Sequence, residues 1–419
     1  MPQSTRRSSP VPRHARPRKQ HPALRVLAVG LVAVLLGAVS LAGAVAQRLQ
    51  GNVKHVDIAA LVDRPTPTST SGATEVADAH AARPVNVLLL GSDDRSGENA
   101  EIGGANGGMR SDTAIVMHVS ADRRRVELVS IPRDSLVDIP ACRLTNQKTT
   151  KPQRAAMFNS AFALGWDNGG DIASAAACTV TTVQATTGVP VDHVAVVDFA
   201  GFQKMVDAVG GVQICVPKAM SDDKTGLNLP AGLNALDGQT ALQFARARYE
   251  TGSDGSDLTR IGHQQQLLAA LAHKVLSKAV LTDPVKLMSF ANAATSALTT
   301  DSGLTSSTAT GLAYSLRGID PAQVVFTTVP NGPAPQDRYR VVWTEAAGRL
   351  WAAMAADRPI TDALAPPSTP VPSTTSQSSA PAPTATVPSP SASQRAAPLP
   401  KDVTSVDQVQ AQASAVCGG

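Results

Sequence analysis

The sequence predicts a layered α/β domain that lies between one transmembrane helix and a disordered tail rich in Pro, Ser and Thr. Three observations predict this arrangement. Short apolar runs with many β-branched residues alternate with helical segments from residue 85 onward, as in layered α/β proteins. An uncharged run of about 21 residues (26–46) has the length needed to cross a bilayer as a helix. Beyond residue 362, low-complexity sequence offers too few apolar side chains to build a core.

The first 25 residues carry a cluster of Arg and Lys, although the formal net charge of the chain is only +4. A basic segment before an apolar run satisfies the orientation rule for insertion, so we expect residues 1–25 in the cytoplasm and the domain outside the cell membrane. A nucleic-acid-binding protein would carry its positive charge over the folded domain, so nucleic acid is not an expected partner. A cleaved signal peptide is the alternative, since Ala44 and Ala46 precede Gln47 as at a cleavage site.

Residues 47–84 lack sustained periodicity and are expected to form a linker, and the folded domain is expected at 85–362. The polar turn at 120–124 separates two apolar runs, which predicts a hairpin of two neighbouring strands. Gly188 and Pro190 end a helical pattern. The expected strands are 85–91, 112–119, 125–131, 192–199 and 212–216, and the expected helices are about 155–164, 172–187, 199–209 and a longer one from 261.

A Pro/Ser/Thr-rich linker is expected at 363–400, followed by a C-terminal segment, 401–419, that forms either a short docked helix or a disordered end. The four cysteines form no CxxC pair, so a metal site is not indicated, and outside the cytoplasm they should pair. Cys142 and Cys178 flank one helical segment and are the preferred disulfide. By elimination, Cys215 and Cys417 are the candidates for a second pair, and the sequence leaves open whether they form one.

Charged residues lie at the ends of two neighbouring strands. Asp93, Asp94 and Arg95 directly follow the first strand, and Arg110 and Asp112 lie at the mouth of the next one. Ligands of open sheets bind outside the carboxyl ends of strands. Two carboxylates delivered there could hold Mg²⁺ through oxygen, whereas a pair of ordinary turn aspartates is the alternative.

Two further clusters contain arginine. Pro132 ends a strand directly before Arg133 and Asp134, so that a guanidinium group is held at a strand end. Arg246 and Arg248 are two residues apart, and in extended chain their side chains would share a face.

Arg260 and Gln264 share one face of a predicted helix, because they are four residues apart. Several guanidinium groups beside magnesium-binding carboxylates suit a pyrophosphate, whose oxygens match the planar guanidinium fork. The alternative is that the arginines pair with Glu250, Asp254 and Asp257 in a solvated surface network.

His118, His193 and His263 each lie singly in a strand or helix pattern, which is typical of structural histidines. The sequence has no GxSxG, HExxH or GxxxxGK[ST] motif, which argues against a serine hydrolase, a zinc protease and a P-loop nucleotide hydrolase.

The order of these clusters behind one N-terminal apolar run resembles the LytR-CpsA-Psr family. The resemblance covers about residues 85–275 and rests on the segments NVLLLGSDDR, RSDTAIVMHVSADRRRVELVSIPRD, FNSAFALG, VVDFAGFQKMVDAVGGVQICVP, LDGQTALQFARARYE and DLTRIGHQQQ. It implies an α/β/α fold: a mixed central β-sheet with helices on both faces and a groove for a polyprenyl-pyrophosphate lipid.

The resemblance also implies roles for single residues. Asp93 and Asp112 would hold Mg²⁺. The pyrophosphate clamp that it implies consists of Arg110, Arg133, Arg246, Arg248, Arg260 and Gln264, with Arg95 beside it. Of these residues, Arg133, Arg246 and Arg248, together with Asp134, are the expected catalytic group, with Asp134 or Asp94 as the general base.

Two positions depart from the family pattern. Met157 stands where the family commonly has Lys, and His263 stands where a further Arg is common. The clamp is therefore expected to be less cationic, unless Lys151 or Arg154 compensates.

The resemblance implies an enzyme that moves a glycopolymer phosphate from a polyprenyl-pyrophosphate carrier onto a peptidoglycan sugar hydroxyl at the cell membrane. A hydrolase that trims such lipids would use the same residues. A noncatalytic regulator or scaffold of the envelope is a third hypothesis. A regulator that binds DNA would need a cytoplasmic module, and only about 25 residues precede the apolar run.

Overall fold

The computed structural model describes residues 51–63, 78, 80–93, 99, 109–250, 253, 255–277, 283–365, 399 and 403–417. They all belong to one compact unit, Leu49–Gly419. The expected transmembrane run 26–46 and nearly all of the expected linker 363–400 lie outside the described residues. Within the described part of the chain, no helix combines the length and the apolar character that crossing a bilayer requires.

The centre of the fold is a mixed eight-stranded sheet with the strand order β1-β12-β7-β2-β3-β4-β13-β16. Three neighbouring pairs, β1/β12, β2/β7 and β4/β13, are parallel, and the others are antiparallel. The mixed sheet is therefore confirmed, and so is the expected hairpin, β3–β4. The strands are β1 (Lys54–Val56), β2 (Val85–Ser92), β3 (Ser111–Val119), β4 (Val126–Ser130), β7 (His193–Val197), β12 (Leu298–Asp301), β13 (Val324–Thr328) and β16 (Val403–Ser405).

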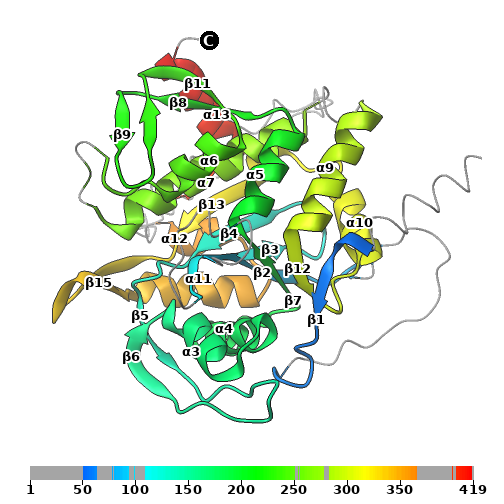
Figure 1. The fold of residues 1–419 in the computed structure, drawn as a ribbon, viewed down its shortest axis with the longest axis vertical. Coiled ribbons are helices and arrows are strands. Elements are labelled where there is room, and N and C mark those ends of the chain that lie inside the picture. Colours follow the sequence, from blue (N-terminus) through cyan, green and yellow to red (C-terminus); the bar gives the residue numbers. More distant parts are fainter. Residues whose placement is uncertain are drawn as a thin grey trace, which may run out of the picture. The chain divides into compact units, whose positions relative to one another are not determined.

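Helices cover both faces of this sheet (Figure 1). One face packs on α3 (Ser160–Gly169), α4 (Ile172–Thr187), α11 (Glu345–Ala355) and α12 (Ile360–Leu364). The other side carries α5 (Phe199–Ala208), α6 (Gly238–Arg246), α7 (Asp257–Val275), α9 (Pro284–Ala297), α10 (Ser306–Ser315) and α13 (Val406–Cys417). Side chains alternate between the faces of a strand, so Leu88 and Leu90 of β2 join the first core, and Val85 and Val87 join the second.

Aspartates and glycines set the ends of the helices beside the sheet. Asp171 accepts a hydrogen bond from Ser174 N and begins α4, and Asp198 begins α5 in the same way through Gly201 N. Gly188 ends α4 with a φ of 69°, a left-handed conformation that glycine adopts without strain. The end predicted at Gly188 is confirmed.

The helix predicted at about 155–164 begins too early. Residues Gln153–Met157 form strand β6, which pairs with β5 (Leu136–Ile139), and α3 starts only at Ser160. Ala155 has a φ of 47°, which no α-helix tolerates. An Ala-rich stretch has high helix propensity, but here pairing with β5 overrides it.

Short hairpins and a 3₁₀ turn complete the described part of the fold. The antiparallel pairs are β8 (Val212–Val216) with β11 (Gly232–Leu236), β9 (Met220–Asp222) with β10 (Leu227–Leu229), and β14 (Asn331–Ala334) with β15 (Asp337–Trp343), and the 3₁₀ turn is η1 (Pro321–Gln323).

The edge strands of the central sheet lie outside the expected domain 85–362. β1 falls in the expected linker 47–84, and β16 falls in the C-terminal segment 401–419, where α13 is the docked helix. Each edge strand has three residues, which is too short to show a period in the sequence.

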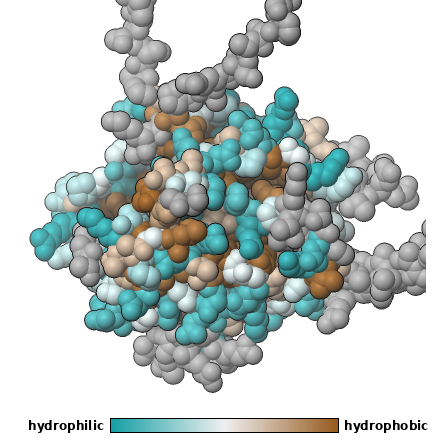
Figure 2. Space-filling model, turned by 90° about the horizontal axis from the view of Figure 1, so that it is seen from above, coloured by the Kyte–Doolittle hydropathy of each residue, from teal (hydrophilic) through white to brown (hydrophobic). Residues whose placement is uncertain are grey.

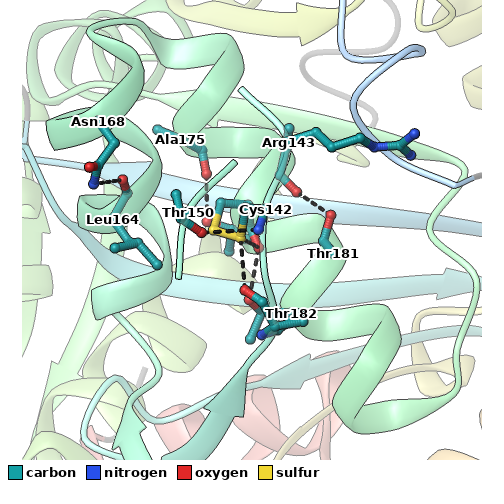
Figure 3. Close-up of a disulfide and its surroundings, with 12 residues drawn as sticks. Cys142, Arg143, Thr150, Leu164, Asn168, Ala175, Thr181 and Thr182 are labelled. Carbon is teal, nitrogen blue, oxygen red and sulfur yellow. Dashed lines mark hydrogen bonds between the residues drawn. A yellow bond between two sulfur atoms is a disulfide. The ribbon is translucent and has the colours of Figure 1, made fainter. Parts of the chain in front are cut away.

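Two disulfides connect distant parts of the chain. Cys142 is joined to Cys178 of α4, with a Cα–Cα distance of 5.1 Å, and Cys215 of β8 is joined to Cys417 at the end of α13. Figure 3 shows Cys142 beside Thr150 and Thr182. Thr150 Oγ1 accepts a hydrogen bond from Cys142 N (3.0 Å), and Thr182 Oγ1 donates to the carbonyl of Cys178 (2.8 Å). The backbone around the first disulfide is thereby satisfied inside the core.

Candidate functional site

A cavity of about 390 Å³ lies between helices α5, α6 and α7 and the strands β2 and β3. Most of its wall is apolar. Side chains from the three helices supply this part, namely Phe199, Phe202, Met205, Leu242, Leu267, Leu268 and Leu271. Seen from the end of the molecule where β8, β11 and α13 lie, hydrophobic residues reach the surface in patches among hydrophilic ones (Figure 2). Because the part of the cavity wall that the three helices supply is apolar, it suits a hydrocarbon chain.

Basic residues gather around the carboxylate of Asp112 at the other part of the same cavity, whose wall also includes Asp198 and Asp222. Five different parts of the chain supply them: β3, the segment after β4, the β9–β10 turn, the end of α6 and the start of α7. The residues are Asp112, Arg133, Lys224, Arg246, Arg248 and Arg260, of which all but Lys224 were expected from the sequence. The cavity therefore joins an apolar wall to a cationic end.

Asp112 is the anionic centre of this end. Arg133 Nη1 lies 2.6 Å from Asp112 Oδ1, and Arg260 Nη2 donates to the Asp112 carbonyl at 2.7 Å. Burial by itself raises the pKa of the Asp112 carboxyl, but Arg260 and Arg133 outweigh it and hold the pKa below its usual value. Asp112 is therefore a carboxylate at neutral pH.

Asp257 does not line the cavity, but it contacts two of the arginines that do, Arg133 and Arg260. Its carboxylate accepts a hydrogen bond from Arg133 N (2.9 Å) and lies 2.5 Å from Arg260 Nη2. Both partners of the second contact are buried, with Asp257 5% and Arg260 4% exposed. Burial raises the pKa of Asp257 and lowers that of Arg260. The alternative interpretation of the sequence placed Asp257 in a solvated surface network with the arginines; Asp257 does pair with Arg260, three residues later on the helix, but the pair is buried.

Arg246 and Arg248 reach the cavity from the end of α6. Ala247 between them is extended (φ −61°, ψ 131°), so both side chains can point the same way. The Arg246 guanidinium lies 4.5 Å from the ring centre of Phe199. Arg248 Nη2 donates to the carbonyl of Gly255 (3.1 Å).

Gln264 lines the cavity one helical turn after Arg260, as their spacing predicts. Its Nε2 donates to the carbonyl of Ala245 (3.2 Å). Lys224, which the sequence did not single out, lies with its ammonium group 3.4 Å from the ring centre of Tyr249, and both line the cavity. Nothing in the sequence marks these two as neighbours, since a hairpin turn brings them together.

Three of the predicted site residues do not line the cavity. Asp93 Oδ1 accepts a hydrogen bond from Arg110 N (2.6 Å), and the side chain of Arg110 is exposed. Asp134 is the third residue outside the cavity wall. Its carboxylate lies 3.1 Å from Arg340 Nη1, 3.8 Å from Arg133 Nε and 4.0 Å from Arg248 Nη2. Asp134 thus holds arginines in place.

Asp94 and Arg95 lie outside the described residues. Met157 is the last residue of β6 and does not line the cavity. Lys151 and Arg154 are exposed and do not line it either, so neither replaces the missing cation.

His263 also points away from the cavity. Its Nε2 lies 3.2 Å from Glu250, and its ring packs on Phe244 at a centroid distance of 4.8 Å. His118 is at the opposite end of β3 from Asp112; it is buried against Asn86 and Asp357 and does not line the cavity.

A metal would find few ligands in the described part of the chain. Among these residues, no group of three or more His, Cys, Asp or Glu side chains could hold a metal ion. Asp112 is the carboxylate among the arginines at the cationic end. Mg²⁺ is commonly held by one or two carboxylates together with substrate phosphates, so this donor chemistry fits a magnesium ion that arrives with a phosphorylated ligand.

Residues 46–354 of the sequence match a model of the LytR_cpsA_psr family. The chain belongs to the LytR-CpsA-Psr family. Curated LytR-CpsA-Psr relatives include the cell wall biosynthesis protein LcpA of Corynebacterium glutamicum, which is 30% identical over 62% of this chain and 52% of its own length. The teichoic acid transferase TagU of Enterococcus faecalis is 30% identical over 53% of this chain and 63% of its own. The chain thus spans about half to two thirds of these relatives.

Among solved structures, the LytR-Csp2A-Psr enzyme from Actinomyces oris is similar with a TM-score of 0.51. It is 24% identical, and the match covers 73% of this chain and 96% of that one. The likeness shows that the two share the LytR-CpsA-Psr fold.

Proposed function

We propose that this protein transfers a phosphate-linked glycopolymer from a polyprenyl-pyrophosphate carrier to a sugar hydroxyl of peptidoglycan. The observation that carries the proposal is the cavity itself. Its apolar wall suits a polyprenyl chain, and its cationic end suits a pyrophosphate. A free nucleotide or a soluble sugar phosphate would not need the hydrocarbon wall.

The relatives support this choice of substrates. The Enterococcus faecalis relative is named a polyisoprenyl-teichoic acid–peptidoglycan teichoic acid transferase, and the Corynebacterium glutamicum relative is named for cell wall biosynthesis. We also propose that the apolar run 26–46 anchors the chain in the cell membrane, with the domain outside, where both substrates would meet it.

The chemistry is a phosphoryl transfer. A sugar hydroxyl attacks the phosphorus that carries the glycopolymer, the bond from that phosphorus to the bridging oxygen breaks, and polyprenyl phosphate leaves with the proton that the hydroxyl loses. Negative charge on the phosphate oxygens is stabilised by the guanidinium groups of Arg133, Arg246 and Arg248, which line the cavity. Arg260, fixed by Asp257, supplies a preorganised cation at the same end.

Asp134 was expected as a general base. It contacts three guanidinium groups and does not line the cavity, which supports a positioning role instead.

We propose that Asp112, with Asp93 directly after the neighbouring strand β2, would hold Mg²⁺ together with the pyrophosphate. Ser92 at the end of β2 pairs with Ser111 at the start of β3. This pairing brings Asp93, the residue after Ser92, close to the start of β3, where Asp112 lies. Bound Mg²⁺ would neutralise charge on the phosphate oxygens. Asp112 lines the cavity and Asp93 does not, so Asp112 would be the principal ligand.

The test is transfer of a labelled glycan from a synthetic polyprenyl-pyrophosphate donor to peptidoglycan by the full chain in detergent. We expect Arg133→Ala and Arg246→Ala to reduce the rate by about 10² to 10³, as when one stabilising group is lost from a comparable site. Arg154→Ala, an exposed arginine outside the cavity, is the matched control. Full activity of both cavity variants would refute the assignment, and release of free phosphorylated glycan in place of a phosphodiester would identify a hydrolase.

A further inference from the structure

A second hollow lies between two hairpins, β5–β6 and β14–β15, and Figure 1 shows β15 reaching out beside β5. We call it the hairpin groove. Its volume is about 390 Å³, and small-molecule sites usually measure about 300 to 1,000 Å³. Its lining includes Leu136, Asp138, Ala155, Pro335, Gln336 and Val342.

Both hairpins that form the groove are connected to the segment around Arg133, one along the chain and the other through side-chain contacts. On one side, β5 begins at Leu136, three residues later. On the other side, β15 carries Arg340, whose Nη1 lies 3.1 Å from Asp134, and Trp343, whose Nε1 donates to Ser135 Oγ at 3.0 Å. The groove is therefore held in a fixed position relative to a guanidinium group of the cavity.

Among the described residues, the two hollows share no lining residue, and the segment from Arg133 to Leu136 passes from one to the other. In phosphoryl transfer, the attacking and leaving oxygens lie roughly in line on opposite sides of the phosphorus. The leaving polyprenyl phosphate occupies the apolar cavity, so the attacking hydroxyl must approach from a different side. The hairpin groove lies outside that cavity and begins at Leu136, three residues after Arg133.

The lining of the groove suits a neutral sugar chain. Leu136, Pro335 and Val342 offer apolar surface for the faces of sugar rings, while Asp138 and the amide of Gln336 offer hydrogen-bonding groups for their hydroxyl and acetamido edges. Asp138 Oδ1 already accepts from Ala155 N (2.9 Å), which orients the carboxylate. Neither Lys nor Arg is among the described lining residues, so a second anionic headgroup finds no partner there.

We propose that the hairpin groove binds the acceptor, a stretch of neutral N-acetylhexosamine glycan that presents its hydroxyl to the phosphate beside Arg133. This inference rests on the proposed function and adds the place where the second substrate binds. Gln336 and Pro335 then determine acceptor affinity without touching the lipid donor.

The experiment measures binding of soluble, uncrosslinked peptidoglycan glycan strands to the full chain in detergent by calorimetry. Gln336→Ala removes the amide, and Pro335→Trp places a bulky ring in the groove at an exposed turn position. We expect about tenfold weaker glycan binding for Gln336→Ala, as for loss of one hydrogen bond, and no measurable binding for Pro335→Trp. Arg154→Ala, on the same β5–β6 hairpin but outside the groove, should bind as the wild type does.

Binding of the polyprenyl-pyrophosphate donor is measured in parallel, and thermal unfolding checks that each variant is folded. Unchanged glycan affinity in folded Pro335→Trp, or absence of glycan binding by the wild type, would overturn the groove assignment. An equal loss of donor affinity in the groove variants would also overturn it. Failure of the wild type to bind or cleave the donor would refute the proposed function by itself, because donor binding does not involve the groove.

Discussion

Glu127 is a fully buried carboxyl on β4, and its burial makes the stability of the domain depend on pH. Its Oε1 accepts a hydrogen bond from Ile360 N (2.9 Å) and lies 3.0 Å from Arg125 Nε. Asp357 and His118 lie in the same network. Burial raises the pKa of Glu127 from 4.5 to about 7, despite the opposing effects of the Ile360 N–H and Arg125.

Because the folded-state pKa is the higher one, the folded protein binds this proton more tightly than the unfolded chain does. The contribution of Glu127 to stability is fully present below pH 4.5 and is lost as the pH rises through about 7. The two pKa values imply a loss on the order of 2.5 kcal/mol in the free energy of unfolding between pH 5 and pH 8. Glu127→Gln keeps an oxygen for Ile360 N and removes the titration.

The assay is urea denaturation of the wild type and Glu127→Gln at several pH values, followed by tryptophan fluorescence. Trp343 and Trp351 pack together at a centroid distance of 5.8 Å and should report unfolding. Burial lowers the pKa of His118, and stability from that group is lost as the pH falls. Both proteins share this term, so the difference between them isolates Glu127. Parallel pH profiles for the two proteins would refute the reasoning.

Three further predictions concern the site and its frame. Asp257→Asn should lower the free energy of unfolding by about 3 kcal/mol, because Arg260 would lose its buried partner; unchanged urea curves would contradict this. Leu271→Ser should weaken binding of a long-chain donor by about tenfold, since apolar surface is lost, and leave a short-chain analogue unaffected. Equal effects on both donors in a binding titration would show that the wall does not hold the chain. Replacing Cys142 and Cys178 by Ser should lower the free energy of unfolding by about 4 kcal/mol, given their separation of 36 residues, and calorimetry under oxidising conditions would measure the loss.

The sequence predicted the central strands and the arginine clusters because both have local signatures. β2 is a continuous apolar run, Arg133 follows the strand β4, and Arg246 stands two residues before a second arginine, Arg248. The short edge strands β1 and β16 have no signature of this kind, since they form only by pairing with distant strands. The same reason explains β6, where pairing with β5 prevails over the helix propensity of alanine.

The site was predictable where charge follows a strand and unpredictable where tertiary packing decides the role. Asp112 and Arg260 were found from their positions, but the burial of Asp257 cannot be read from a surface-like segment. Lys224 reaches the cavity only through the β9–β10 turn. Asp93 and Asp134 are aspartates near strand ends, as Asp112 is, yet neither lines the cavity. Asp93 accepts a hydrogen bond from Arg110 N, and Asp134 pairs with Arg340.

The return of the chain to the central sheet through β16 has a consequence for proteolysis. A cut anywhere between residues 366 and 398 would leave the fragment that contains β16 and α13 linked by Cys417 to Cys215. The two products would then migrate as one molecule until a reductant separated them. A nonsense mutation in the same interval, by contrast, would remove an edge strand, a docked helix and a covalent link together.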